Sequence, residues 1–581
     1  MPTEIDFQNS LLYETGTVNG IEFDTTPDEL KIRNAIEHVT SANCWQGIEL
    51  PPGYEITNNK LCKMNGKYPI CRKPIVLSAI GENIDSGEFW YKITFMDPLE
   101  RIQEIYAKHE QIIKKNELMK ITNQGILVDE KKGAELCEYL ADSIDYNATN
   151  LKHNMFVSKN GWKNNNEIFV LGNQYYSSEH IGPVRHVNEE SVKGLTKKGT
   201  LKDWVAGTRD IIAEPIIRFK CYCAVSSNIL RLLDMPPYIV DHNGNTSTGK
   251  TLSTKFAFSM YGNPEELMLS GQSTPTYLEE MASNYDDFAL CIDETSLQSS
   301  EILTTIIYMF GNGSGKGRGK KDGGVRKMKR WKSVAFTTGE KPIADADGFG
   351  GQQVRVVEIQ RELPKLPEIV KTTEDTLAGN YGHVGELFIR KVFEHKDELR
   401  SRFAYYRDMF TNNESSTMNR AGTYFAAIAV AGELLEEVFD EIGIEVIDHL
   451  ELVKDFFNET VKEKPIVPYP VKALRAVNGW FEENRGYFVV NDDMDSYKHA
   501  VKYGWITRNG YLDIITSTLK DAMKMQNINL GSVLDSWEKD GIITLSAGRK
   551  DFQARHSDGN GGSPRIGVYR FNLEKMREYL E

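Results

Sequence analysis

The chain has 581 residues and a formal net charge of −14, with 40% hydrophobic and 26% charged residues. This is the composition of an ordinary soluble globular protein, and its acidity argues against a protein coated in nucleic acid. No stretch approaches about 20 apolar residues and the N-terminus lacks a signal-peptide core, so we expect a cytoplasmic protein without membrane spans. The seven cysteines are scattered and odd in number, which favours a reducing compartment over a disulfide framework.

The first 205 residues predict two accessory regions, in a chain long enough for three to five domains. Residues 53–95 alternate β-branched and aromatic side chains between turn residues, which predicts a small antiparallel β module. Residues 98–144 then take on a helical period. We assign residues 1–110 to an N-terminal α+β module and residues 111–205 to a region of helices and a β-hairpin.

A phosphate-loop motif follows a short apolar run. Gly244, Gly249, Lys250 and Thr251 have the spacing G-x-x-x-x-G-K-[ST], in which backbone N–H groups surround a phosphate. Lys250 supplies a positive charge for the β- and γ-phosphates, while Thr251 supplies a hydroxyl for Mg²⁺ and opens a helix. The predicted ATP-binding residues are Gly244, Asn245, Thr246, Ser247, Thr248, Gly249, Lys250 and Thr251.

Two adjacent carboxylates end the next apolar segment, residues 288–294. Asp293 is suited to holding Mg²⁺, and Glu294 is suited to orienting an attacking water. An isolated Asp-Glu pair after a strand is usually a solvated turn, but a phosphate loop earlier in the same chain favours a catalytic role for this pair. The sequence therefore predicts hydrolysis of the γ-phosphate of ATP, with ATP and Mg²⁺ as cofactors.

Residues 316–332 carry nine Lys or Arg and one Asp on this acidic chain. Asp322-Gly323-Gly324 is a turn signal, so we predict a basic hairpin between the carboxylate strand and a strand at 333–338. A solvated loop is the alternative, but in a ring ATPase this position faces the central pore. The predicted DNA-binding residues are Lys316, Arg318, Lys320, Lys321, Arg326, Lys327, Lys329 and Arg330.

Three further residues are candidates for contacts with the nucleotide. Thr338 ends the strand at 333–338, where a γ-phosphate sensor is expected. Arg355 is either a buried structural ion pair or an arginine finger that reaches a neighbouring subunit's nucleotide, and we favour the finger. Arg420, just before a helix rich in small residues, is either a second sensor in a helical lid or a surface residue.

The remaining chain predicts a core, a lid, a linker and a terminal domain. Residues 206–365 form the ATPase core, residues 366–460 a helical lid, and residues 461–470 a proline-rich linker. Residues 471–581 contain a helix, a strand, a long basic turn and a return strand, which is typical of a winged helix. Such domains contact DNA or other proteins, and the sequence leaves both open.

Several of these motifs together resemble the Cch-type replicative helicases of staphylococcal cassette chromosomes, within a helicase-like family of phages and integrative elements. The resemblance covers about residues 50–440. It is carried by Gly244–Thr251, Ser259-Met-Tyr-Gly-Asn-Pro264, Cys291-Ile-Asp-Glu294, Gly315-Lys-Gly-Arg-Gly319, Thr337-Thr-Gly-Glu340 and Gln352-Gln-Val-Arg355.

The resemblance implies an α/β multidomain protein with an AAA+ P-loop core akin to archaeal MCM helicases. It also implies a hexameric ring with the basic hairpin in the pore, Arg355 as the finger acting in trans and Arg420 as the second sensor. The chain departs from many AAA+ proteins at the first sensor, where it has Thr337-Thr338 in place of Asn.

We therefore expect an ATP-dependent hexameric DNA helicase that translocates on single-stranded DNA and replicates a mobile genetic element. The expected partners are further copies of the chain, single-stranded and forked DNA, and replication proteins of the element. The alternative is an ATP-switched DNA-binding initiator or regulator that does not unwind DNA, with its specificity in the C-terminal domain.

Overall fold

The computed structural model describes residues 43–580, apart from short gaps at residues 67, 320–323, 326–327, 345–354, 365, 412–415, 463–468, 492, 494–500, 527 and 557–561. Four predicted DNA-binding residues, Lys320, Lys321, Arg326 and Lys327, lie outside this described part. The chain divides into two units, with the boundary between residues 460 and 461. This division falls at the start of the proline-rich segment.

The N-terminal module is built on a four-stranded sheet of order β7-β6-β5-β8. Its strands β5 and β6 form the antiparallel pair expected from the alternating side chains at residues 53–95. Helix α4 covers the sheet, and the hydroxyl of Tyr139 donates to the Ile75 carbonyl at 2.8 Å. The elements are β5 (Ile75–Glu82), β6 (Phe89–Met96), β7 (Ile102–Lys108), α4 (Gly133–Asn147) and β8 (Lys152–His153).

A second antiparallel sheet follows, with the strands in sequence order. Its first two strands form a β-hairpin within residues 111–205, as the sequence predicts. The indole N–H of Trp162, on the first strand, donates to the Asn228 carbonyl at 2.7 Å. This contact ties the small sheet to the central part of the unit. The strands are β10 (Gly161–Lys163), β11 (Ile168–Leu171), β12 (Gln174–Tyr176) and β13 (Ile181–Pro183).

The central sheet has five parallel strands in the order β16-β17-β18-β15-β19. Its strands β15 and β18 are buried along their whole length, as expected for a parallel sheet covered on both faces. Parallel strands end at the same edge, so the residues that follow β15, β17 and β18 meet there. The strands are β15 (Tyr238–Asn243), β16 (Met268–Ser270), β17 (Leu290–Asp293), β18 (Val334–Gly339) and β19 (Val356–Ile359).

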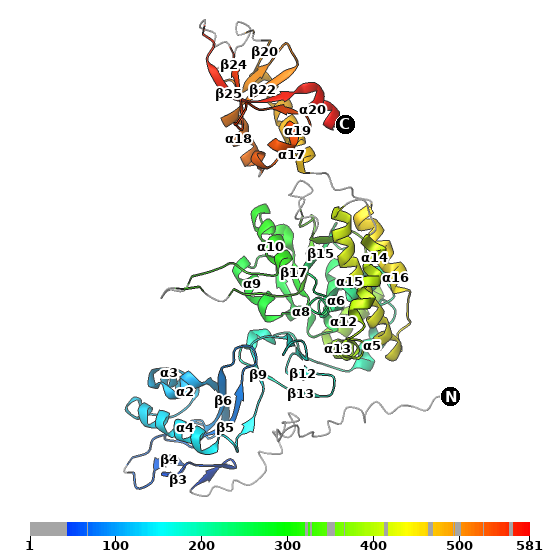
Figure 1. Ribbon diagram of the computed structural model, residues 1–581. Coiled ribbons are helices and arrows are strands. Elements are labelled where there is room, and N and C mark those ends of the chain that lie inside the picture. Colours follow the sequence, from blue (N-terminus) through cyan, green and yellow to red (C-terminus); the bar gives the residue numbers. More distant parts are fainter. Residues whose placement is uncertain are drawn as a thin grey trace, which may run out of the picture. The chain divides into compact units, whose positions relative to one another are not determined.

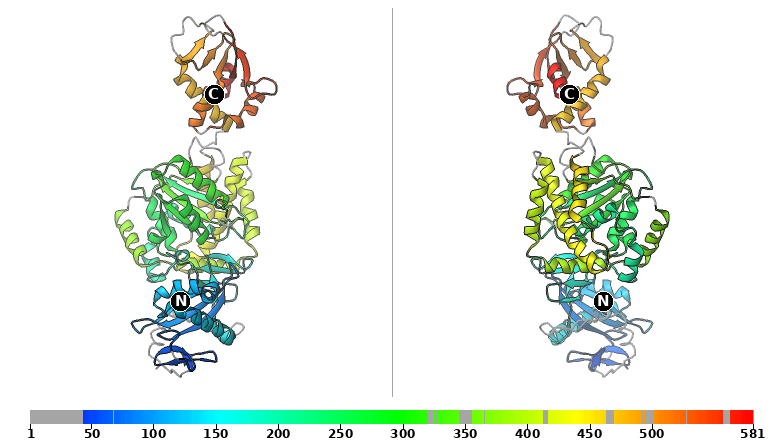
Figure 2. Two further views of the ribbon diagram at one scale, coloured as in Figure 1. Left: turned by 90° about the vertical axis from the view of Figure 1, so that its left-hand side faces the viewer. Right: turned by 90° about the vertical axis from the view of Figure 1, so that its right-hand side faces the viewer.

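Helices cover the central sheet, and α14, α15 and α16 gather on one side of it (Figures 1 and 2). Helix α6 is buried from Ile216 to Ser226. The helices used below are α6 (Pro215–Ser226), α7 (Lys250–Ser259), α9 (Pro275–Asn284), α10 (Ser300–Asn312), α12 (Pro367–Gly379), α13 (Val384–Glu394), α14 (Leu399–Thr411), α15 (Ser416–Glu441) and α16 (His449–Phe457).

The C-terminal unit has a core of its own, to which Leu474, Trp537 and Phe571 contribute. Its sheet has the order β20-β21-β22-β25-β23, and β24 pairs with β25. The predicted helix, strand and return strand correspond to α19, β23 and β25. The elements are α17 (Tyr469–Glu483), β20 (Phe488–Val490), β21 (Gly504–Ile506), β22 (Tyr511–Ile515), α18 (Thr516–Met525), α19 (Leu534–Lys539), β23 (Ile543–Thr544), β24 (Phe552–Arg555), β25 (Arg565–Asn572) and α20 (Leu573–Leu580).

Candidate nucleotide site and basic hairpin

The predicted phosphate loop joins the end of β15 to the start of α7. Gly249 has a left-handed backbone (φ 82°), and a Cβ atom there would lie 2.4 Å from the Cβ of Leu363, so only glycine fits. The Lys250 ammonium group donates to the carbonyl of Gly244 at 2.9 Å and to that of Asn245. The lysine therefore lies within the curl of the loop, at the positive end of α7.

The two predicted catalytic carboxylates lie at the end of β17, beside Thr338 of β18. The Thr338 hydroxyl donates to the Asp293 carboxylate and accepts from the Glu294 N–H at 3.1 Å. Glu294 itself has a left-handed backbone, with φ at 60°. The structure thus brings three predicted residues, from two neighbouring strands, to the edge of the sheet where the loop lies.

Thr337 faces the other way, because neighbouring residues of a strand point to opposite faces. Its hydroxyl donates to the buried carboxylate of Asp241 at 2.6 Å, and the Ile343 N–H donates to the same carboxylate at 3.0 Å. Burial raises the pKa of Asp241 to about 6. Of the two threonines, only Thr338 contacts Asp293 and Glu294 within the described contacts.

The basic hairpin is described at residues 314–319, 324–325 and 328–332. Antiparallel bridges join Ser314 to Arg330 and Gly319 to Val325, so the two arms pair as a hairpin. Lys316 and Arg330 are exposed. These two residues are therefore accessible to a polyanion.

Two other predicted DNA-binding residues of the hairpin form ion pairs with α9. Arg318 binds the Glu279 carboxylate through two hydrogen bonds, of 2.8 and 2.9 Å, and the Glu279 side chain is only 3% exposed. Lys329 pairs with Glu280, whose side chain is half exposed. Arg318 and Lys329 thus anchor the hairpin to α9.

Arg355 lies at the start of β19, beside the amino-terminal end of β15. Its guanidinium group donates to the Asn312 side chain at 3.3 Å and lies over the Tyr308 ring at 5.4 Å. Both partners are on α10. The phosphate loop follows the opposite, carboxyl-terminal end of β15, about 17 Å away along a strand of six residues.

Arg420 is exposed on α15. Burial raises the pKa of Tyr424, and the charges of both arginines act on that phenol to lower it. The Tyr424 ring stacks on Tyr238, the first residue of β15, with the ring centroids 4.8 Å apart. The structure therefore does not bring Arg420 to the phosphate loop of its own chain.

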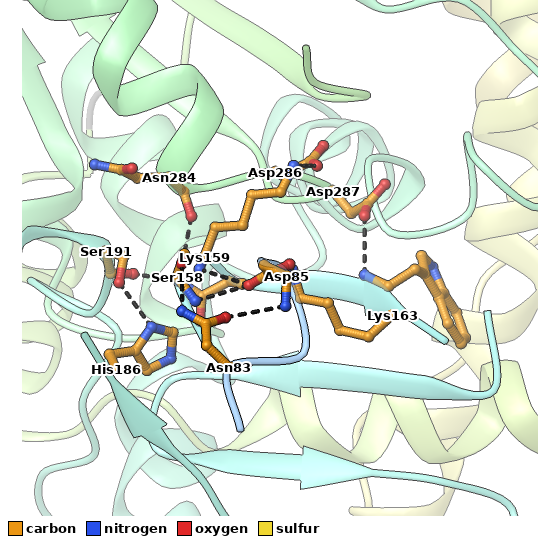
Figure 3. A network of polar contacts seen from close by, with 12 residues as sticks. Asn83, Asp85, Ser158, Lys159, Lys163, His186, Ser191, Asn284, Asp286 and Asp287 are labelled. Carbon is orange, nitrogen blue, oxygen red and sulfur yellow. Dashed lines mark hydrogen bonds and ion pairs between the residues drawn. The ribbon is translucent and has the colours of Figure 1, made fainter. Parts of the chain in front are cut away.

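Asp286 and Asp287, which follow α9, belong to a network of polar contacts with residues of the accessory regions (Figure 3). Asp286 accepts from the backbone N–H of Lys332 at 2.9 Å and also pairs with Lys159 and Arg231. Its neighbour Asp287 accepts from the Trp162 N–H at 2.9 Å. The last basic residue of the hairpin is thereby fixed to the segment that precedes β10.

The same network extends into the N-terminal module through Asp85, in the turn between β5 and β6. Its carboxylate accepts from the Lys163 ammonium group at 2.7 Å and from the Ser158 N–H at 2.7 Å. Burial lowers the pKa of Lys163. Burial also raises the pKa of Asp287, and the charge of Asp286 adds to this shift.

Sequence reasoning missed Asp241 and Lys220, which are both fully buried near the phosphate loop. A signal was present for Lys220, because it stands among apolar residues in a helix that has no exposed face. Within the described ranges, no group of three His, Cys, Asp or Glu residues is placed to hold a metal ion, and no helix is long and apolar enough to cross a membrane.

Residues 50–330 match a family model described only as a domain of unknown function (DUF927). No curated protein matches the chain. Among solved structures, the chain is similar to "SCCmec type IV Cch - active helicase", with a TM-score of 0.63 and 18% identity over 91% of this chain and 98% of that one. The apo structure of the NrS-1 C-terminal region also matches, with a TM-score of 0.24 and 9% identity over 84% of this chain and 95% of that one.

The match to the Cch structure spans both units of the chain and nearly the whole of the other protein. It confirms the resemblance that the motifs predict. The chain is a mixed α/β, multidomain protein built on a parallel sheet, with the fold of the Cch helicase structure.

Proposed function

We propose that the chain is an ATP-dependent DNA helicase. The observation that carries this proposal is the contact of Thr338 with both Asp293 and Glu294, at the sheet edge where the phosphate loop opens α7. An ATPase needs a phosphate cradle, a metal ligand and a water-orienting carboxylate at one place. The candidates for all three roles lie at this edge.

Each residue has a defined part in the proposed hydrolysis. Lys250 and the loop backbone bind the phosphates, and Glu294 orients the attacking water. The Thr251 hydroxyl and the Asp293 carboxylate are hard oxygen donors of the kind that Mg²⁺ prefers, and the bound ion would neutralise charge on the phosphates. Thr338 orients Asp293 and Glu294 through its hydroxyl group and acts as the first sensor.

The two arginines support a site that is shared between subunits. Arg355 and Arg420 lie at the end of β15 opposite the phosphate loop. Arginines placed there complete the nucleotide site of a neighbouring copy in a head-to-tail ring. We therefore assign Arg355 as a finger and Arg420 as a second sensor, both acting in trans in a hexamer.

The basic hairpin would carry single-stranded DNA through the pore of this ring. Lys316 and Arg330 are exposed, while Arg318 and Lys329 hold the hairpin to α9. Contacts to phosphates are tolerant of sequence and weaken as salt rises. Replication of a mobile element, with its own replication proteins as partners, is the role that fits this activity.

The proposed organisation keeps the predicted domains. Residues 206–365 are an AAA+ core and residues 366–460 a helical lid, with the α+β module and the hairpin region before them. Residues 471–581 are a winged-helix domain. The order of α19, β23 and β25 along the chain supports this assignment.

Strand displacement on a forked duplex tests the proposal. The unmodified chain should unwind the fork with ATP and Mg²⁺, and Glu294→Gln should abolish unwinding. The double variant Lys316→Ala, Arg330→Ala should hydrolyse ATP but not unwind, whereas Lys371→Ala, at an exposed lysine of α12, should behave like the unmodified chain.

Two results would overturn the helicase proposal. ATP hydrolysis without unwinding by the unmodified chain, on a tail of either polarity, would support the initiator or regulator instead. Normal ATPase activity in Lys250→Ala would refute the nucleotide site itself.

A further inference from the structure

Helix α6 carries two fully buried cations, Arg218 and Lys220, and only Arg218 is paired with a carboxylate. The guanidinium group of Arg218 lies 2.9 Å from the carboxylate of Glu436 on α15. This ion pair offsets the cost of burying the arginine charge. The positive charge of Arg218 is thus balanced by a carboxylate of the same chain.

Lys220 points instead to α7, directly behind the phosphate loop. Its ammonium group donates to the Lys250 carbonyl at 3.0 Å, the Ser253 hydroxyl at 3.0 Å and the Thr254 hydroxyl at 2.7 Å. An ammonium group has three donors, so its hydrogen bonds are complete. All three acceptors are neutral, and within the described residues Lys220 forms no ion pair with a carboxylate.

A buried charge without an ionised partner is costly, and a lysine in this position loses its proton more easily. Burial lowers the pKa of Lys220 to about 7. Asp293 and Asp241 lie near enough to oppose this shift, but they do not outweigh the burial. Lys220 therefore changes between its charged and neutral forms near neutral pH.

A bound nucleotide would bring the missing negative charge. Lys250 and the first turn of α7 hold the phosphates, and a helical turn rises only about 5.4 Å, so Lys220 lies one turn behind them. Inside a protein, a charge at this range is screened far less than in water. Phosphates in the loop should therefore favour the charged form of Lys220.

We propose that Lys220 is a positioning residue of the nucleotide site, which holds the first turn of α7 and whose charge is balanced by the phosphates of the bound nucleotide. The inference rests on the proposed ATPase. It adds a regulatory consequence, because binding of the nucleotide is coupled to uptake of a proton by Lys220. Affinity then falls as pH rises through the pKa of the free site.

Other titratable and charged groups face Lys220 from α6, α7, β15 and β17. Burial raises the pKa of the thiols of Cys223 on α6 and Cys291 on β17. On β15, burial lowers the pKa of His242 to about 2 and raises that of Asp241 to about 6. The remaining charged neighbours are Asp293 on β17 and Lys250 on α7.

The test is equilibrium binding of a non-hydrolysable Mg-ATP analogue by the full chain, measured from pH 6.5 to pH 9. The unmodified chain should lose up to about tenfold in affinity per pH unit above pH 7.5, because binding takes up one proton. Lys220→Arg keeps its charge at every pH, and its affinity should vary less with pH. Lys220→Met should bind about tenfold more weakly at pH 6.5 and should lack the slope.

Lys255→Met is the matched control, since Lys255 is on α7 but pairs with Glu265 at the surface. It should keep the slope of the unmodified chain. The nucleotide analogue itself changes protonation with pH, and this affects the affinity of every variant equally. It cancels when the affinity of each variant at a given pH is divided by that of Lys220→Arg.

The proposal is overturned if folded Lys220→Arg keeps the full slope, or if Lys220→Met matches the unmodified chain in both affinity and slope. If Lys220→Met does not fold, the Lys220→Arg curve alone decides. Failure of the unmodified chain to bind the analogue at any pH would instead refute the proposed ATPase.

Discussion

At the scale of single residues, Thr338 is the best test of the proposed catalytic edge. Replacing it with Ala removes the hydroxyl that joins the Asp293 carboxylate to the Glu294 N–H. Groups that orient catalytic residues are typically worth about 10–100-fold in activity. We therefore expect Thr338→Ala to lower kcat for ATP hydrolysis by about that factor, with little change in nucleotide affinity.

Two other variants serve as controls for Thr338→Ala. Thr338→Ser keeps the hydroxyl and should retain most of the activity. Thr337→Ala removes the contact with buried Asp241, so it should lower thermal stability more than kcat. Steady-state ATPase kinetics and thermal unfolding separate these cases, and an unchanged kcat in Thr338→Ala would refute the assigned role.

The same residues show what a sequence can predict about a site. Lys250, Asp293 and Glu294 are found from local spacing, because a phosphate loop and a strand with terminal carboxylates are short, contiguous patterns. Thr338 is chosen from its place at the end of a predicted strand, but its contacts with Asp293 and Glu294 depend on β17 pairing with β18, which the sequence does not reveal. Lys220 and Asp241 escape prediction because their partners come from elements that are distant in the sequence.

At the scale of elements, the hairpin and α9 act together. Arg318 is held by the buried carboxylate of Glu279, whereas Lys329 is held by the half-exposed Glu280. Breaking a buried pair leaves an unpaired charge, while an exposed pair contributes under about 1 kcal/mol. Since Arg318 is itself a third exposed, we expect Glu279→Gln to cost about 2 kcal/mol, locally at the hairpin.

Glu279→Gln should therefore reduce unwinding while ATP hydrolysis continues, because a hairpin that has lost its anchor transmits less of the motion. Glu280→Gln is the matched control and should unwind DNA normally. Strand displacement and ATPase rates measured on the same preparations check this. Equal loss of unwinding in both variants would show that Glu279 has no special role.

The basic hairpin also marks the limit of charge patterns as predictors. Nine cations in one segment predict a polyanion contact, and the arms do pair as a hairpin. The sequence does not reveal that Arg318 and Lys329 face carboxylates of α9, which lie about 40–50 residues earlier in the chain. A charge run shows the sign of a surface but not which of its members are already paired.

At the scale of the whole molecule, the chain combines a larger unit built on the parallel sheet with a smaller C-terminal unit that has its own core. Within the smaller unit, buried Asp513 binds Arg570 through hydrogen bonds of 2.7 and 2.6 Å and His556 through one of 2.6 Å. Burial alone would raise the pKa of Asp513, but these hydrogen bonds outweigh it and lower the pKa. A buried, satisfied cluster of this kind indicates a structural centre, so the unit is built to fold on its own core.

The assignment of the arginines is a statement about the assembly, because neither reaches its own phosphate loop. Arg355→Ala and Glu294→Gln should each abolish ATP hydrolysis when assayed alone. In a mixed ring, a phosphate loop from an Arg355→Ala subunit can face Arg355 of a Glu294→Gln subunit. That site has every catalytic group, so mixing the two inactive proteins should restore part of the activity.

A finger acting within its own subunit cannot give this recovery, because each variant subunit would still lack one group of its own site. The activity of the mixture, followed as the ratio of the two variants changes, should peak at intermediate ratios and vanish at both ends. Mixing Glu294→Gln with Lys250→Ala is the matched control. Both residues come from the subunit that supplies the phosphate loop, so every site in this mixture lacks one of them. Recovery in that control, or none in the first mixture, would refute a nucleotide site shared between subunits.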